Sequence, residues 1–261
     1  MPKHLYIITG ASRGLGFAMA QQLLQPDHVL LCISRQENAE LNAAAQARSC
    51  ALEQWPLNLD HGLEAATRLT QWLGGQASSE ASFQSATLIN NAALLPTIAP
   101  LSASDPAEIA TVLRVGLEAP MQLCSAFLGG TEHWKTADGQ SATRRVLNIS
   151  SGLGRSAMAS QSVYCALKAG MDHFTRCLAL EEAAKPGGAK VCSMAPGVID
   201  TDMQVHLRSA NPSSFADQGR FLDLKAKGQL SSADACAAKL LGYLNSADFG
   251  SNPIADIRDA A

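Results

Sequence analysis

Tyr164 and Lys168 are two residues whose chemistry is useful only when they lie close together. A tyrosine phenol has an unperturbed pKa of about 10, so near neutral pH it transfers a proton poorly unless a nearby cation stabilises its phenolate form. Both residues lie in the stretch from Ser162 to Ala184, where apolar residues recur with the period of a helix. Side chains four residues apart share one helix face, so the sequence predicts a phenol beside an ammonium. An isolated pair of this kind is usually two chance neighbours on a solvated face.

A glycine-rich turn follows the first apolar run of the chain. Leu5 to Thr9 is a candidate buried parallel strand, and it leads through Gly10, Gly14 and Gly16 into a helical pattern. Glycines at such a turn let the backbone bend tightly and approach a pyrophosphate, whose charge is favourable at a helix N-terminus. The spacing departs from the usual dinucleotide fingerprint. The position of the glycines between a strand and a helix nevertheless indicates a dinucleotide site.

An arginine follows the second predicted strand, which runs from Val29 to Ile33. In dinucleotide folds an acidic residue near this position binds the adenosine ribose, whereas an arginine accommodates a 2′-phosphate. Arg35 and Arg13 are available here, and the first acid after the strand is Glu37. The sequence therefore favours NADP(H) over NAD(H). The alternative is that both arginines are simply solvated.

Segments with strand and helix patterns alternate along the rest of the chain. Further strands are predicted at residues 55–59, 86–89, 146–149 and 190–194. Further helices are predicted at residues 61–73, 106–128 and 231–244. Exposed polar loops are predicted at residues 74–85 and 131–145. The alternation predicts an α/β fold with a doubly wound parallel sheet of the Rossmann type and helices on both faces.

Three features complete this outline. Pro120 should kink the second of these helices, because proline cannot donate the backbone hydrogen bond that a helix interior needs. Residues 204–228 hold short helical pieces and are long for a connection, so we expect them to cover the substrate as a lid. Residues 253–257 are expected to add a last strand at the sheet edge. Residues 1–261 contain no linker or repeat, so we expect a single domain.

The composition argues against several classes of function. Hydrophobic residues make up 47% and charged residues 16% of the chain, as in ordinary globular proteins. A net charge of -3 and a pI near 6.1 leave no basic surface for nucleic acid or an anionic membrane. The cysteines and histidines have no disulfide or metal-ligand spacing, so we expect reduced thiols and no metal site. Without a basic leader or a long apolar run, a cytoplasmic protein is expected.

Five motifs together resemble the short-chain dehydrogenase/reductase family in order and spacing, over essentially the whole chain. They are Gly10-x-x-x-Gly14-x-Gly16, Asn90-Asn91-Ala92, Ser151, Tyr164-x-x-x-Lys168 and Pro196-Gly197. Within the family, the second half is most similar to the branch that contains sepiapterin reductase and the bacterial benzil reductases. This narrower resemblance lies in Asn148 to Ser151, Leu178 to Glu182, Asp200 to Gln204 and Asp256 to Asp259.

The resemblance implies hydride transfer between NADPH and a carbonyl. Tyr164 would protonate the carbonyl oxygen, Lys168 would lower the phenol pKa and hold the nicotinamide ribose, and Ser151 would hydrogen-bond the substrate oxygen. Ser151 could instead be a turn cap. The cofactor site implied by the resemblance consists of Gly10, Ser12, Arg13, Gly14, Leu15, Gly16, Arg35, Asn58, Leu59, Asn91, Ala92, Tyr164, Lys168, Pro196, Gly197, Ile199 and Thr201.

The sequence also departs from the family pattern. Gly116 stands where the family commonly has an Asn that holds a relay water, so Tyr164 would be reprotonated by another route or more slowly. Asn58 replaces the usual Asp beside the adenine, and Ala93 replaces a common glycine. Asp256 aligns with an Asp that anchors the pterin amines in sepiapterin reductase, and a carboxylate is a suitable acceptor for that edge. A solvated or capping role is the alternative for Asp256.

The main functional hypothesis is an NADPH-dependent carbonyl reductase that acts on a vicinal diketone such as benzil. One alternative is a reductase of a pterin side chain. From another class, the protein could be a non-catalytic sensor that binds NADP(H), for which Gly116 is the supporting feature and the intact catalytic residues are the opposing one. By analogy with the family, the long helices at residues 106–128 and 162–184 are expected to pair in a homodimer.

Overall fold

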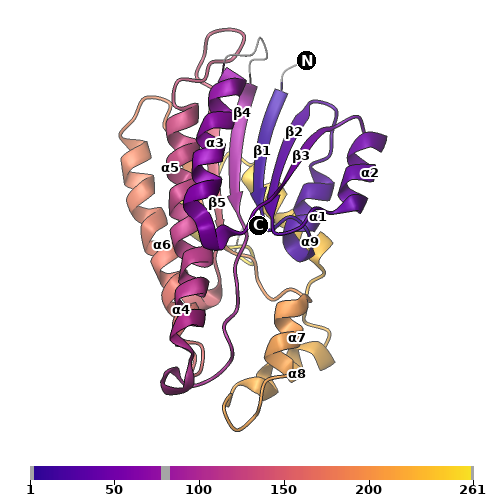
Figure 1. Ribbon diagram of the computed structural model, residues 1–261, viewed down its shortest axis with the longest axis vertical. Coiled ribbons are helices and arrows are strands. Elements are labelled where there is room, and N and C mark those ends of the chain that lie inside the picture. Colours follow the sequence, from indigo (N-terminus) through magenta and orange to yellow (C-terminus); the bar gives the residue numbers. More distant parts are fainter. Residues whose placement is uncertain (1–2, 78–82, 260–261) are drawn as a thin grey trace.

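A seven-stranded sheet forms the centre of the computed structural model, which describes residues 3–77 and 83–259 (Figure 1). The strands follow the order β3-β2-β1-β4-β5-β6-β7, and each neighbouring pair is parallel. The strands are β1 (Lys3–Thr9), β2 (His28–Ser34), β3 (Ala51–Pro56), β4 (Phe83–Asn90), β5 (Thr143–Ile149), β6 (Lys190–Ala195) and β7 (Ile254–Asp256). The predicted Rossmann-type α/β fold and the predicted edge strand near residue 255 are confirmed.

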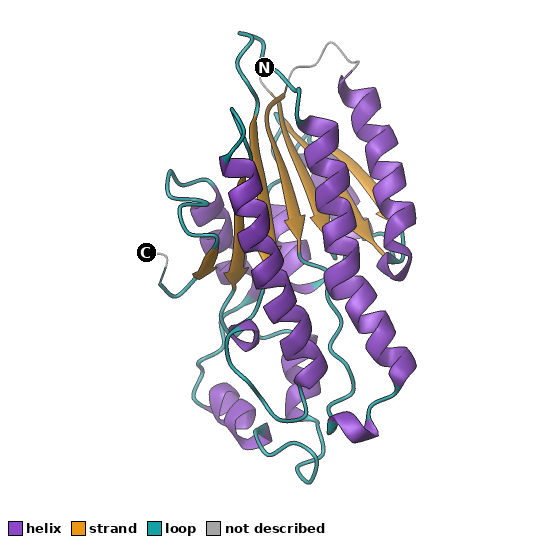
Figure 2. Ribbon diagram, turned by 90° about the vertical axis from the view of Figure 1, so that its left-hand side faces the viewer, coloured by secondary structure: helices purple, strands orange, loops and turns teal. Residues whose placement is uncertain are grey.

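Helices cover both faces of the sheet (Figure 2). One face packs against α1 (Gly14–Gln22), α2 (Ala39–Ala47) and α9 (Ala233–Leu244), and the other packs against α3 (Gly62–Ala77), α5 (Ala119–Thr131) and α6 (Ser162–Ala183). Successive side chains of a strand point to opposite faces, so Tyr6 and Ile8 of β1 enter the first core while Leu5 and Ile7 enter the second. Alternate residues of the same buried strand therefore serve two separate cores.

The strand order reverses between β1 and β4, which makes this the place where an open α/β sheet binds its ligand. Asn91 donates two hydrogen bonds to Thr9, both at 3.0 Å. Its backbone N–H donates to the Thr9 hydroxyl, and its side-chain amide donates to the Thr9 backbone carbonyl. These bonds fix the residues that follow β1 and β4 side by side. The Gly10 turn and the Asn91 turn therefore meet at the carboxyl edge of the sheet.

The prediction for the third strand was wrong in its bounds. β3 spans Ala51–Pro56, whereas Leu59–His61 forms a 3-10 turn. β3 lies at the edge of the sheet, where only Trp55 among its residues is buried, so its sequence lacks the apolar run of a central strand. The pairing of β3 with β2 positions Asn58 and the residues around it at the end of this edge.

The predicted loop at residues 74–85 is also partly wrong. α3 continues to Ala77 and β4 begins at Phe83, while residues 78–82 lie outside the described part of the chain. Glycines at 74 and 75 lower helix propensity by roughly 1 kcal/mol each relative to alanine, which is why they indicated a loop. Packing against α5 compensates: a Cβ on Gly130 would lie 2.8 Å from Leu73 Cδ1, so the glycine lets the two helices approach closely.

The predicted exposed loop at residues 131–145 is confirmed in part: most of its residues are exposed, but the segment also carries buried side chains. Trp134 is buried and stacks on Phe83 with ring centroids 4.9 Å apart. Arg144 lies in β5 and forms a buried ion pair with Glu182 of α6. The partners of Trp134 and Arg144 are distant in the sequence, so local polarity could not show that the two residues are buried.

The predicted helix at residues 106–128 is divided into three parts. α4 (Pro106–Leu113) passes into a π-helical turn, Arg114–Glu118, before α5 begins at Ala119. Pro120 has no N–H to donate to the carbonyl of Gly116, and its ring crowds that carbonyl. The distortion that the structure records lies in the turn before Pro120, as a local widening of the helix.

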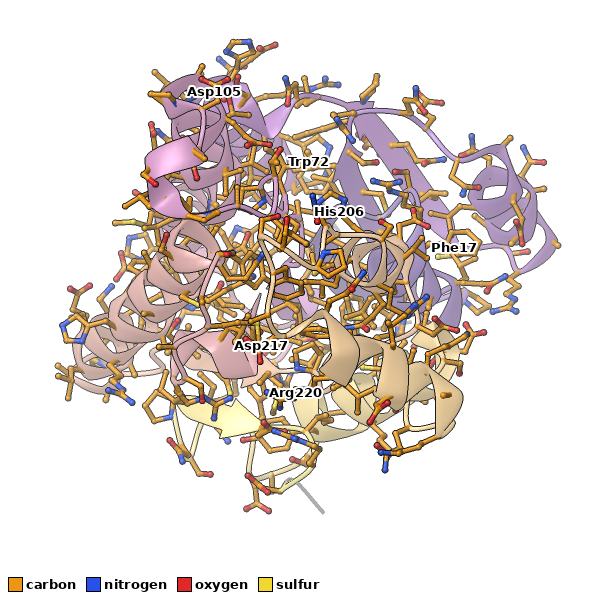
Figure 3. The ribbon with its side chains drawn as sticks, turned by 90° about the horizontal axis from the view of Figure 1, so that it is seen from below. Phe17, Trp72, Asp105, His206, Asp217 and Arg220 are labelled. Carbon is orange, nitrogen blue, oxygen red and sulfur yellow. The ribbon has the colours of Figure 1, made fainter. Side chains whose placement is uncertain are left out.

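The last irregular part lies below the carboxyl edge of the sheet. It contains α7 (Asp202–Arg208) and α8 (Gln218–Ala226), the short helical pieces that were predicted. Figure 1 shows α7 and α8 beneath the strand ends. In Figure 3, which views the molecule from below, His206 of α7 lies in front of the strand ends. Within residues 3–77 and 83–259, no helix combines the length and the apolar character needed to cross a membrane.

Candidate active site

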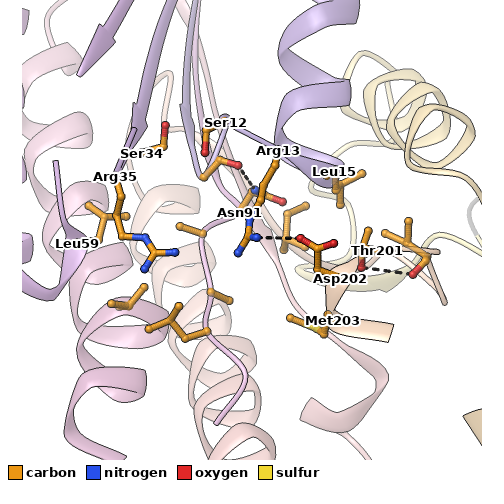
Figure 4. Close-up of a pocket in the computed structure, with 18 of the residues that line it drawn as sticks. Ser12, Arg13, Leu15, Ser34, Arg35, Leu59, Asn91, Thr201, Asp202 and Met203 are labelled. Atoms are coloured by element: carbon orange, nitrogen blue, oxygen red, sulfur yellow. Dashed lines mark hydrogen bonds and ion pairs between the residues drawn. The ribbon is translucent and has the colours of Figure 1, made fainter. Parts of the chain in front are cut away.

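A cleft of about 560 Å³ opens at the carboxyl edge of β1 and β4 (Figure 4). It brings together most of the residues predicted from widely separated parts of the sequence. The predicted residues that line it are Gly10, Ser12, Arg13, Gly14, Leu15, Arg35, Asn58, Leu59, Asn91, Ala92, Tyr164, Lys168, Pro196, Ile199 and Thr201. Ser151, Gly16, Gly197 and Asp256 lie outside this lining.

The glycine turn between β1 and α1 is shaped for close approach. Gly10 and Gly14 have φ values of 69° and 56°, in the left-handed region that favours glycine. Gly16 acts by packing, because a Cβ there would lie 2.2 Å from the Gly10 carbonyl oxygen. Arg13 is the N-cap of α1 but makes no side-chain cap, so the first N–H groups of the helix face the cleft without a side-chain acceptor. This arrangement suits a phosphate group.

Two arginines flank the cleft (Figure 4). Arg13 forms an ion pair with Asp202 at 2.8 Å, and both side chains are largely exposed. Arg35 follows β2 and makes no ion pair with any described residue. An exposed pair such as Arg13 and Asp202 contributes at most about 1 kcal/mol, so either guanidinium can turn to an anionic ligand at little cost.

The catalytic candidates meet at the inner end of the cleft. Tyr164 and Lys168 lie one turn apart on α6, and both are buried, with 6% and 3% of their surface exposed. Lys168 Nζ lies 5.6 Å from the centre of the Tyr164 ring and donates a hydrogen bond to the Ile149 carbonyl at 2.7 Å. Ser151 accepts a hydrogen bond from the Leu153 N–H at 3.2 Å, and its hydroxyl acts to lower the pKa of Tyr164. Ser151 thus caps a turn while facing the phenol.

Burial dominates the acidity of these groups. It raises the pKa of Tyr164 to about 12, although the hydrogen bond with Ser151 acts in the opposite direction. It lowers the pKa of Lys168 to about 8, and the charge of Asp172 partly offsets this effect. Burial therefore opposes the lowering of the phenol pKa that we expected from Lys168. The phenol carries its proton at neutral pH, and it donates that proton readily only when a cation stabilises the phenolate.

Several residues around the site were not predicted. The Tyr164 hydroxyl contacts Met203 Sδ at 3.8 Å. Asn148, fully buried in β5, accepts a hydrogen bond from Asn90 and donates one to Thr175 of α6, both at 2.9 Å. A buried amide needs such partners, so an Asn inside an apolar strand was a usable signal. The network ties β4, β5 and α6 together behind the catalytic pair.

Two predicted residues take other positions. Gly197 has a φ of 80° and forms the turn after β6 instead of lining the cleft. Asp256, at the end of β7, is buried and accepts three hydrogen bonds from Arg258, two from the guanidinium at 2.8 and 2.6 Å and one from the backbone N–H at 3.1 Å. Arg155 lies 3.6 Å from the same carboxylate. These cations lower the pKa of Asp256, first through the Arg258 hydrogen bonds.

Comparison with known proteins decides the family. Residues 4–212 match the short chain dehydrogenase family. The chain is a member of this family. It is therefore an oxidoreductase.

The relatives also support the predicted branch. The chain is 36% identical over 245 residues to a benzil reductase ((S)-benzoin forming) of Bacillus cereus. The matched region covers 93% of this chain and 94% of the relative. It is 32% identical to sepiapterin reductase of Meriones unguiculatus, over 97% of this chain and 95% of that protein. Among solved structures, the chain resembles a short-chain dehydrogenase/reductase from Burkholderia vietnamiensis with a TM-score of 0.64 and a sequence identity of 32%. The match covers 100% of this chain and 99% of that chain.

This short-chain dehydrogenase differs from the family pattern at Gly116. Gly116 lies in the π-helical turn and faces α6, where a Cβ would lie 3.1 Å from Leu167 Cδ1. Leu167 is fully buried and thus fills the space in front of the glycine. An asparagine here would press on the flexible end of a leucine side chain, so the position is crowded but not closed.

Proposed function

We propose that this short-chain dehydrogenase is an NADPH-dependent carbonyl reductase and that its substrate is a vicinal diketone such as benzil. The observation that carries the proposal is geometric: Tyr164 is buried beside Lys168 on α6, and both line the cleft that the Gly10 turn also lines. Two of the relatives at more than 30% identity are benzil reductases of Bacillus species.

The catalytic residues divide the work of carbonyl reduction. NADPH, when bound, supplies the hydride. Ser151 hydrogen-bonds the substrate oxygen and stabilises the charge that develops on it. Tyr164 then donates its phenolic proton to that oxygen. The Lys168 ammonium would hold the ribose of the bound cofactor, and it stabilises the negative charge that remains on the Tyr164 oxygen. Burial of Tyr164 and Lys168 excludes water from the proton transfer.

The preference for NADPH is assigned to Arg35 and Arg13. A phosphate bound by an arginine gains about 1.5–3 kcal/mol per charged hydrogen bond. We expect Arg35→Ala to weaken NADPH binding about 10- to 100-fold and to leave NADH binding almost unchanged. Fluorescence titration of both cofactors measures this difference. Arg48→Ala, which removes a guanidinium bonded to the Gln21 carbonyl away from the cleft, is the matched control. An equal loss of affinity for both cofactors would contradict the assignment.

The surroundings of Tyr164 favour an apolar substrate. Leu94 and Met203 line the cleft and pack against the apolar cluster that contains Tyr164, and Met203 Sδ contacts the Tyr164 hydroxyl. An aryl diketone presents apolar surface and two carbonyl oxygens to such walls. A pterin needs an acceptor for its amines, and the carboxylate aligned with that role, Asp256, already pairs with two arginines. The pterin reductase therefore remains the second candidate, supported by the sepiapterin reductases among the relatives.

Steady-state oxidation of NADPH, followed by its absorbance, tests the substrate with benzil and sepiapterin in parallel. We expect benzil to be reduced and the rate to collapse in Tyr164→Phe. Turnover of sepiapterin without benzil would contradict the diketone assignment and give Asp256 a part in binding. NADPH binding without turnover of either compound would favour the non-catalytic sensor.

Two further assignments accompany this function. The segment at residues 204–228 would act as the substrate lid, since Leu207, Phe215 and Phe221 form a small apolar cluster of their own with Ile98. The chain would also form a homodimer through α5 and α6, which expose Met121 and Leu180. Light scattering coupled to size-exclusion chromatography measures whether the chain forms a dimer.

A further inference from the structure

Asp172 is a buried acid that the reaction described above does not use. It lies on α6 one turn beyond Lys168 and has 4% of its surface exposed. Its Oδ1 accepts hydrogen bonds from the hydroxyls of Ser150, at 2.5 Å, and Ser193, at 2.7 Å. Ser150 follows β5 and Ser193 lies within β6. One oxygen of Asp172 therefore joins α6 to the end of β5 and to the interior of β6.

The second oxygen of Asp172 faces the loop that carries Ser151. Oδ2 has no hydrogen-bond partner among the described residues. A Cβ on Gly154 would lie only 2.8 Å from it, so the turn that Ser151 caps, Gly152–Gly154, packs directly on this oxygen. A carboxylate held in this place by two neutral hydroxyls is costly to bury, and its charge is not neutralised by a direct ion pair.

The charge of Asp172 acts on Lys168. The two residues are four apart on the helix, and the carboxylate opposes the effect of burial on the ammonium. Lys168 donates to a neutral group, the Ile149 carbonyl. Two further titratable groups near the pair are the Tyr164 phenol and the Cys192 thiol, and burial raises the pKa of each to about 12.

Most of the charged groups at the cleft rim form ion pairs with one another and not with Lys168. Arg13 pairs with Asp202. Asp200 pairs with Lys225 and Arg208. Arg35 lines the cleft after β2. The field that supports the buried ammonium thus comes from Asp172, on the same helix.

We propose that Asp172 is a positioning residue of the reductase, whose carboxylate fixes α6 against the end of β5 and against β6 and keeps the Lys168 ammonium charged beside Tyr164. This inference rests on the proposed function only for the role given to Lys168. The link between the two charges follows from the cofactor-free protein and can be measured there.

Asp172→Asn separates the charge from the shape. Asparagine keeps the size of the side chain and an oxygen that accepts from Ser150 and Ser193, but it carries no charge. We expect the alkaline limb of the pH profile of kcat/KM to move down by about one unit, which is roughly a tenfold loss above the new pKa. Ser193→Ala keeps the charge and removes one hydrogen bond, so it should lower the thermal stability and leave the limb in place.

The coupling between Asp172 and Lys168 can also be measured without turnover. A double-mutant cycle combines Asp172→Asn with Lys168→Met, and the thermal stability of each variant is measured as a function of pH. Because the folded pKa of Lys168, about 8, lies below its ordinary 10.5, the unfolded chain binds more protons between these values, so the lysine makes stability rise with pH in that window. In Asp172→Asn this rise should begin at lower pH, and Lys168→Met should abolish it in both backgrounds.

The outcomes discriminate between the two proposals. A shift in the unfolding cycle supports the inference even if no tested ketone is reduced, which would count against the proposed function alone. An unmoved limb and an unmoved stability curve in Asp172→Asn would make Asp172 a structural residue only and overturn the inference. If the Asn variant does not fold, Asp172→Ala also lacks the carboxylate, and an unshifted profile in that variant would overturn it equally.

Discussion

Tyr164→Phe is expected to lower kcat for ketone reduction by about 10²- to 10⁴-fold, the contribution of a positioned general acid. The substitution removes the hydroxyl that faces Ser151 and Met203 and keeps the ring that packs on Leu167. Binding of NADPH and the melting temperature should therefore change little. Measurement of kcat with benzil, of Kd for NADPH and of the melting temperature separates lost chemistry from lost structure.

Tyr243→Phe is the matched control for this loss. Tyr243 lies on α9 and its hydroxyl contacts the Asp248 carbonyl at 3.5 Å, away from the cleft. Activity of this variant should match the parent protein. A Tyr164→Phe variant that retained more than about a tenth of the parent kcat would show that another group donates the proton.

Glu182→Gln is expected to reduce the free energy of unfolding by about 3–5 kcal/mol, because it leaves the Arg144 charge buried without its partner. The two side chains are 3% and 2% exposed and lie 3.4 Å apart, between β5 and the end of α6. Glu182 also accepts from the Ala189 N–H at 2.8 Å. Urea unfolding of the two proteins measures the difference.

Glu132→Gln supplies the comparison for a solvated pair. Glu132 lies 3.4 Å from Lys185, and both are about two-fifths exposed, so its loss should cost at most about 1 kcal/mol. If Glu182→Gln cost no more than this control, the buried pair would not be a major stabilising contact.

The Glu182 carboxyl should also make stability depend on acid pH. Burial acts to raise its pKa, but hydrogen bonds from Lys185 and Ala189 and the charge of Arg144 outweigh burial and lower the pKa below its ordinary 4.5. The stabilisation is therefore complete above the unfolded value and is lost as pH falls through the folded one. This acid-side loss should be smaller in Glu182→Gln, as thermal unfolding between pH 3 and 6 would measure.

The sequence by itself determined the features that depend on local periodicity and on motif order. The alternation of buried strands and amphipathic helices required a parallel sheet, whose carboxyl edge collects every turn that follows a strand. The Gly10 turn, Asn91 and Thr201 therefore had to meet there. The spacing of Tyr164 and Lys168 placed them on one face of α6, as the structure confirms.

Only the tertiary structure decided how polar residues pair across long distances in the chain. Arg144 looked like part of an exposed loop until Glu182, far along the sequence, was found against it. Asp256 aligned with a substrate anchor, but Arg258 and Arg155 share its carboxylate. Burial likewise opposes the expected lowering of the Tyr164 pKa, because desolvation depends on everything packed around a group, and sequence spacing carries no information about that packing.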